Sequence, residues 1–211
     1  MLNYLLFDLD NTLYSSACGL EDNVRRRMQE YSAAFLGLSA GEAWKERMDK
    51  VHIYGTNLEW LMAEKDFTDI EDYLAVVHPA DEADCLPPNP ELRKFLAGIS
   101  VPSAILTNSP REHVDRILSK LDLEGIFTHI FDIRLCNFIG KPQPVFFRAA
   151  LNILGVQSDT VLFIDDSPRY VEGFIKLGGQ GVLLDENNLH PNFPHPRIRR
   201  LEELSAYLER L

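Results

Sequence analysis

Residues 7–14 have the sequence FDLDNTLY, which places two aspartates, Asp8 and Asp10, directly after the short apolar run NYLLF at residues 3–7. The apolar run predicts a short buried strand that ends at Asp8. Residues two apart on an extended backbone point to the same side, so both carboxylates can face one spot. Two carboxylates at close range each disfavour the ionisation of the other. We therefore expect positive charge beside this strand end.

Beyond residue 100 the sequence alternates between expected strands and expected helices. With the first strand included, strands are predicted at 3–7, 101–108, 129–133, 159–166 and 180–185, and helices at 109–123, 144–155, 168–179 and 201–210. Such alternation is typical of right-handed crossovers that build a parallel sheet with helices on both faces. The expected fold class is α/β, a Rossmann-like parallel sheet flanked by helices.

Residues 15–90 interrupt this alternation and are predicted to be mostly helical. Apolar side chains recur at helical spacing in 20–36, 41–53 and 57–64. The helical region ends at CLPPNPEL, residues 85–92, whose prolines mark a linker and the start of a new helix. We interpret 15–90 as a small helical domain inserted after the first strand. Residues 1–14 and 91–211 then form the core domain.

The composition excludes several classes of function. The 211-residue chain has 32 acidic and 21 basic residues and a formal net charge of −11. Binding to a nucleic-acid polymer needs a basic face, so none is expected as a partner. Three widely spaced cysteines, with no signal-peptide pattern and no long apolar run, predict a soluble cytoplasmic protein without membrane contact.

Polar clusters follow three of the expected strands, at the sheet edge where ligands bind in such folds. Each aspartate pair alone could be ordinary turn or cap chemistry. Together, so many carboxylates at one edge favour a hard cation, and Mg²⁺ takes a few carboxylates while keeping waters and a substrate phosphate. The clusters are Asp8 and Asp10 after the first strand, Thr107 and Asn108 after the second, and Asp165 and Asp166 after the fourth.

Local capping explains part of the second cluster. In TNSPRE, residues 107–112, Ser109 and Glu112 match the N-cap and the acid of a capping box, and Ser167 matches a cap in DDSPR. Thr107 and Asn108 are left over. Their hydroxyl and amide, beside a helix N-terminus, can donate to a phosphate oxygen.

Covalent phosphoryl transfer would use both carboxylates of the first cluster. Asp8 as the nucleophile would form an aspartyl-phosphate. Asp10 would then be the general acid for the leaving alcohol and the general base for water. Lys141, in the loop sequence IGKPQP, is either an ordinary solvated lysine or the compact cation that a phosphate among carboxylates requires.

Four motifs in this order, DLDNT, TN, GKP and IDDS, resemble those of the haloacid dehalogenase superfamily of phosphatases, and the resemblance covers the whole chain. The stretches FDLDNTLY, IYGTNLEWL and FIDDSPRYVEGFIKLG are similar to the pyrimidine 5′-nucleotidase branch. The resemblance implies that residues 15–90 are a cap that closes over the site, excludes water and selects the leaving group.

The resemblance also implies roles for the acidic residues. Asp8 would be the nucleophile, and Asp10 the acid/base whose backbone carbonyl also contacts the metal. Asp166 would be the direct Mg²⁺ ligand. Asp165 would contact the metal through a water or would support a residue that does bind it. The dehalogenases of this superfamily typically lack the second aspartate of the first motif, so Asp10 argues against dehalogenation.

The remaining motif residues would bind the phosphoryl group, with Thr107 and Asn108 holding it and Lys141 neutralising it. The expected function is a Mg²⁺-dependent phosphomonoesterase on a small phosphorylated metabolite, a nucleoside 5′-monophosphate. The alternatives are a phosphotransferase, mutase or phosphatase acting on sugar phosphates, and a non-catalytic phosphate-binding regulator.

Substrate choice would depend on cap residues that face the site. Arg25, His52 and Tyr54 are the candidates. Each has an ordinary alternative. Arg25 belongs to a run of arginines typical of a solvated helix face, His52 could be a surface or a core residue, and Tyr54, like Trp60, could be cap core.

Overall fold

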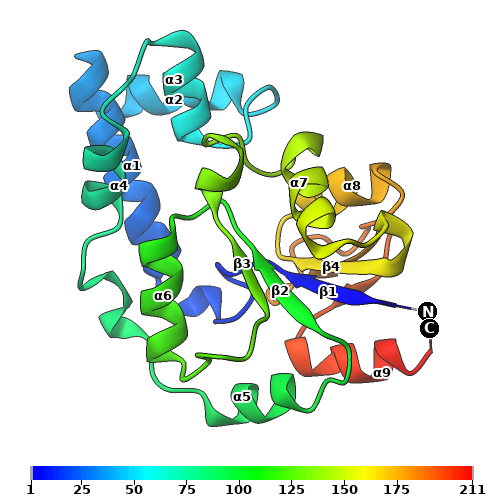
Figure 1. Cartoon of the computed structure of the whole chain (residues 1–211). Helices are drawn as coiled ribbons and strands as arrows, with labels where there is room; N and C mark the ends of the chain where they lie inside the picture. The colour runs from blue at the N-terminus through cyan, green and yellow to red at the C-terminus, as the bar shows by residue number, and fades with distance from the viewer. Residues whose placement is uncertain (1, 211) are drawn as a thin grey trace.

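The computed structural model describes residues 2–210 and contains a six-stranded, fully parallel sheet in the order β3-β2-β1-β4-β5-β6 (Figure 1). The central strands β1 and β4 have apolar side chains on both faces, as expected where helices cover a parallel sheet on both sides. The predicted fold class is confirmed. The strands are β1 (Tyr4–Phe7), β2 (Ser103–Leu106), β3 (His129–Phe131), β4 (Val161–Asp165), β5 (Gln180–Leu184) and β6 (Arg197–Ile198).

Two layers of helices cover the sheet, and successive side chains of β1 alternate between them. Leu5 and Phe7 pack in one hydrophobic cluster with Val114 and Leu204, whereas Leu6 packs in the other with Phe147. The first layer comprises α5 (Pro90–Ala97), α6 (Arg111–Lys120) and α9 (Leu204–Leu208), and the second α7 (Pro144–Leu154) and α8 (Pro168–Lys176).

Of the five α-helices between β1 and β2, α5 packs on the sheet and the other four stand beyond one side of it (Figure 1). We propose that they form the cap, with its boundaries at 15–90. Helix α2 begins with a capping box between Ser39 and Glu42, and Trp60 is fully buried, as its interpretation as cap core predicts. The helices are α1 (Leu20–Leu36), α2 (Ala40–Lys50), α3 (Asn57–Glu64) and α4 (Ile70–Val77).

Strand register determines which polar side chains meet at the carboxyl edge of the sheet. Phe7 pairs with both Ile105 of β2 and Ile164 of β4. One residue further along, Asp8 therefore lies level with Asp165, and its N–H donates to the carbonyl of Ile164 at 2.8 Å. The polar clusters that follow the first and fourth predicted strands are thus neighbours.

One local prediction is wrong and a second is confirmed only in part. Ser109 does not build a capping box with Glu112, because its hydroxyl donates to Asp10 Oδ2 at 2.6 Å and Glu112 pairs with Arg134 at 2.9 Å. Ser167 stands at the N-cap of α8 but makes no side-chain cap bond. The short edge strand β6 follows the proline-containing loop and was not predicted.

Among residues 2–210, no helix has the length and the apolar character needed to cross a bilayer.

Candidate active site

A cavity of about 410 Å³ lies between the carboxyl edge of the sheet and the cap helices. It is the place where a ligand would bind in this fold. Every residue predicted to react, to bind the phosphoryl group or to hold the metal lines it except Asp165, which is fully buried. The lining residues from the sheet side are Asp8, Asp10, Asn11, Thr107, Asn108, Ser109, Ile133, Lys141, Asp166, Ser167 and Tyr170.

Lys141 is 1% exposed and bridges two of the carboxylates. Its Nζ donates to Asp8 Oδ1 at 2.7 Å and to Asp165 Oδ2 at 2.6 Å. Burial alone would lower the pKa of this lysine, but Asp165 and Asp8 hold the pKa above its ordinary value. Lys141 is therefore a buried ammonium ion at the strand ends and not a solvated loop lysine.

Asn108 holds the loop that carries this lysine. Its Oδ1 accepts from the N–H of Lys141 at 2.7 Å, and its Nδ2 donates to the carbonyl of Lys141 at 3.1 Å. A Cβ atom at Gly140 would overlap Asn108 Oδ1, so glycine is required for this approach. The amide of Asn108 thus already serves the lysine loop, while Thr107 Oγ1 accepts from the N–H of Ser109 at 3.0 Å.

The side chain of Asp10 is held by three donors. Tyr14 and His113 reach its Oδ1 at 2.5 and 2.7 Å, and Ser109 reaches its Oδ2 at 2.6 Å. Burial alone would raise the pKa of Asp10, but His113, Ser109 and Tyr14 bring it well below the ordinary value. The first motif therefore separates its two carboxylates into different environments, one beside Lys141 and the other among neutral and histidine donors.

Three carboxylates form a candidate metal centre. Asp8, Asp165 and Asp166 each offer an oxygen, and these oxygens lie within 4.8 Å of one another. Burial and mutual repulsion raise the pKa of Asp8 to about 8 and that of Asp166 to about 7. Asn11 Oδ1 is also buried and has no partner within residues 2–210.

This donor set fits Mg²⁺, a hard cation that prefers oxygen ligands and would relieve the repulsion. The side chain of Asp10 is not in this group, and a contact of its backbone carbonyl with the metal stays a prediction.

The cap contributes one face each of α1 and α2 to the cavity. Val24 and Met28 of α1 and Trp44 and Met48 of α2 give it a largely apolar wall. Arg47 interrupts that wall, and its Nη1 is buried without a partner in the part of the chain that the structure describes. Because i and i+4 positions share a helix face, an arginine between the apolar positions 43, 44, 48 and 51 was a signal that sequence reasoning missed.

The three cap residues predicted to set specificity have different positions. Arg25 lines the cavity but also pairs with Glu21 and Asp22 at the surface. His52 is exposed and does not line the cavity. Tyr54 packs against the core and donates to Glu64 at 3.1 Å.

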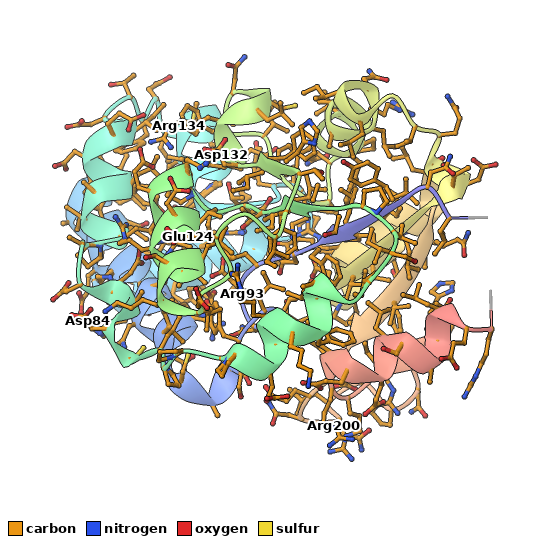
Figure 2. The ribbon with its side chains drawn as sticks, turned by 60° about the horizontal axis from the view of Figure 1, so that its bottom comes forward. Asp84, Arg93, Glu124, Asp132, Arg134 and Arg200 are labelled. Carbon is orange, nitrogen blue, oxygen red and sulfur yellow. The ribbon has the colours of Figure 1, made fainter. Side chains whose placement is uncertain are left out.

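The cap is in contact with the sheet domain on opposite rims of the cavity. On one rim Arg134, labelled with Asp132 in Figure 2, bridges Glu71 of α4 at 2.8 Å and Glu112 of α6 at 2.9 Å. On the other rim, Gly55 lies so close to the carbonyl of Lys141 that a Cβ would overlap it. The structure is therefore a closed arrangement of the cap.

Residues 2–178 match the haloacid dehalogenase-like hydrolase family, and the chain belongs to that family. It is 25% identical over 189 residues to "Phosphate metabolism protein 8" of Saccharomyces cerevisiae, with 82% of this chain and 58% of the yeast protein covered. It is 26% identical over 131 residues to "Haloacetate dehalogenase H-2" of Moraxella sp. (strain B), which covers 57% of this chain and 58% of that protein. The chain thus spans little more than half the length of these relatives.

A solved structure of a HAD phosphatase from Thermococcus onnurineus superposes with a TM-score of 0.64 at 20% identity, covering 98% of each chain. At 20% identity, this similarity shows that the two chains share a fold and shows nothing of their substrates. The relatives include both phosphatases and a dehalogenase, so the family membership defines a hydrolase and leaves its substrate to the chemistry of the site.

Proposed function

We propose that this protein is a Mg²⁺-dependent phosphomonoester hydrolase that acts through an aspartyl-phosphate on nucleoside 5′-monophosphates. The observation that carries the proposal is the division of labour between Asp8 and Asp10. Asp8 lies among a buried ammonium ion and two further carboxylates, whereas Asp10 lies apart, held by three hydrogen-bond donors.

In the first step a carboxylate oxygen of Asp8 attacks phosphorus, and the bond from phosphorus to the ester oxygen breaks. The leaving oxygen takes a proton from the Asp10 carboxyl. A neighbouring negative charge raises the pKa of a carboxyl, so an approaching phosphate favours the protonated form of Asp10. Lys141 keeps the ammonium charge beside the phosphoryl group throughout.

In the second step water attacks the aspartyl-phosphate, Asp10 accepts the water proton, and phosphate and free Asp8 are released. Asp8 and Asp166, supported by Asp165, would hold the metal ion. When bound, Mg²⁺ neutralises charge on the transferring phosphoryl group.

Asp10 also distinguishes phosphate esters from halogenated acids. A halide leaves as a stable anion and needs no proton, whereas an alkoxide needs one. The three donors to Asp10 would have no evident use in a dehalogenase. A nucleoside as the leaving group is supported by the cavity, which is large enough for a small ligand and combines apolar walls with Arg47, whose buried Nη1 has no partner within residues 2–210.

The test is phosphate release from nucleoside monophosphates, sugar phosphates and aryl phosphates, with Mg²⁺ or with a chelator. Asp8→Asn should abolish turnover, and the matched control Asp159→Asn, at an exposed position, should not. Halide release from haloacetate without phosphate release would overturn the proposal. Phosphate transfer to an added alcohol in place of water would favour the phosphotransferase alternative.

A further inference from the structure

The segment that returns from the cap to the sheet domain contains a buried carboxylate that the proposed mechanism does not use. Glu82 begins the short helical turn Glu82–Cys85, and its side chain is 0% exposed. Arg116 contacts its Oε1 from Nε at 3.0 Å and from Nη2 at 2.8 Å, and Arg27 lies 3.8 Å from its Oε2. Two guanidinium groups thus balance this carboxylate, so it does not need a metal ion as a counter-charge.

His113 joins Glu82 to the active site. Its imidazole is 0% exposed in the first turn of α6, with Nδ1 2.8 Å from Glu82 Oε1 and Nε2 2.7 Å from Asp10 Oδ1. Carboxylates only accept hydrogen bonds, so the ring donates from both nitrogens. A second histidine, His78, closes the cluster with Nδ1 3.0 Å from Glu82 Oε2.

We propose that His113 and Glu82 are positioning residues for the acid/base carboxyl, an inference that rests on the proposed function. Glu82 fixes the imidazole, and the imidazole fixes the rotamer of Asp10, so that its carboxyl meets the leaving oxygen. Tyr14 shares Oδ1 with His113, and Ser109 holds only Oδ2. Removal of the imidazole therefore leaves Tyr14 as the one donor of these three that still holds Oδ1, so the Asp10 carboxyl can rotate.

Glu82 also makes this geometry depend on the cap. Tyr14 lies in the segment that leaves the sheet domain, and Glu82 lies in the segment that returns to it. Both connections to the cap thus help to hold Asp10. Tyr14 of the outgoing connection donates to it directly, and Glu82 of the returning connection acts through His113. A shift of either connection moves a donor of the acid/base residue.

Proton transfer to the leaving oxygen matters most when that oxygen is strongly basic. A misplaced Asp10 should therefore slow the hydrolysis of phosphate esters of weakly acidic phenols much more than the hydrolysis of esters of strongly acidic phenols. The quantity to measure is kcat/KM, because it includes only the steps through cleavage of the ester bond and omits hydrolysis of the aspartyl-phosphate. A series of substituted phenyl phosphates keeps the size of the leaving group nearly constant.

Two substitutions separate the two hydrogen bonds of the imidazole. His113→Gln places an amide near the position of Nε2 and can still donate to Asp10, whereas His113→Asn places an amide near Nδ1 and cannot reach Asp10. We expect His113→Asn to lower kcat/KM for phenyl phosphate by about 10- to 100-fold more than for p-nitrophenyl phosphate, a loss at the lower end of what a general acid contributes. His113→Gln should retain most of the wild-type ratio.

His129→Asn, at an exposed histidine of β3, is the matched control and should leave kcat/KM unchanged for phenyl phosphate and for p-nitrophenyl phosphate. An equal loss for both esters, or the same loss in the Asn and Gln variants, would show a merely structural role and overturn the inference. If His113→Asn does not fold, Glu82→Gln provides the comparison, with the same selective loss expected at smaller size. A wild-type protein that hydrolyses no phosphate ester would overturn the proposed function, and this inference with it.

Discussion

Replacement of Lys141 by methionine is expected to destabilise the metal-free protein by about 3–5 kcal/mol, as is usual when one partner of a buried ion pair is removed. Methionine keeps most of the aliphatic volume, so the change removes the charge with little change in packing. The ammonium is 1% exposed and contacts Asp8 and Asp165 at 2.7 and 2.6 Å. Without it, two carboxylates face each other in a buried site.

The magnitude follows from opposing contributions. At an effective dielectric constant of about 20, each contact at this distance gives about 6 kcal/mol of attraction. Removal of the lysine from water costs several kcal/mol in the wild-type protein, and this cost disappears in the variant. Proton uptake by one carboxyl limits the loss further, since burial already raises the pKa of Asp8. The net loss therefore falls well below the sum of the two attractions.

Urea unfolding at pH 9, where Asp8 with its pKa of about 8 is ionised, in the presence of a chelator measures the difference in the free energy of unfolding. Lys176→Met is the matched control, because that lysine is 79% exposed and its pairing with Glu172, at 4.0 Å, contributes little. Addition of Mg²⁺ should recover part of the loss in Lys141→Met, since a cation then stands between the carboxylates. A destabilisation below 1 kcal/mol would refute the argument that Lys141 balances their charge.

Three further predictions concern the pH, the cavity and the cap. The pKa of Asp8 is raised to about 8 in the folded protein, so the folded state binds this proton more tightly than the unfolded state does. The metal-free protein should therefore lose stability as the pH rises from about 4 to about 8, and thermal unfolding should show Mg²⁺ stabilising it more at pH 8 than at pH 6. Arg47→Met should raise KM for nucleoside monophosphates about tenfold, as the loss of one charged hydrogen bond predicts, and should raise KM for aryl phosphates less. The control Arg26→Met, at an exposed arginine, should leave both KM values unchanged. Gly55→Ala should lower kcat/KM because its Cβ overlaps the carbonyl of the lysine loop, whereas Gly41→Ala, which meets no neighbouring atom, should have no effect in the same steady-state assay.

Local sequence patterns predicted the helices of the cap well. The expected ranges 20–36 and 57–64 coincide with α1 and α3. Helix α1 ends at Gly37, which adopts a left-handed conformation with φ of 67°. Apolar spacing and end signals act within a few residues, so they can be recognised in a single sequence. The candidate site residues were also recognisable, because each follows a predicted strand or lies in a motif.

Long-range partners were not recognisable in the same way. Ser109 has the sequence context of a cap, but it donates to Asp10, and only the strand register brings the two together. His113 and Glu82 carry no local signal at all. Their meeting depends on how α6 packs against the returning connection of the cap. Sequence reasoning therefore identified the groups that we propose to react and missed the residues that hold them in place.

The central place of β1 in the sheet has a consequence for the order in which the protein is made. Its partners β2 and β4 follow about 100 and about 160 residues later in the chain. At roughly 5–20 residues per second, β1 waits about 5–20 s on the ribosome before β2 exists. The cap helices, whose contacts are mostly local, have time to form first. In a nascent chain that ends at residue 100, the cap helices should therefore resist a protease while the strand that leads to the proposed nucleophile is still cleaved.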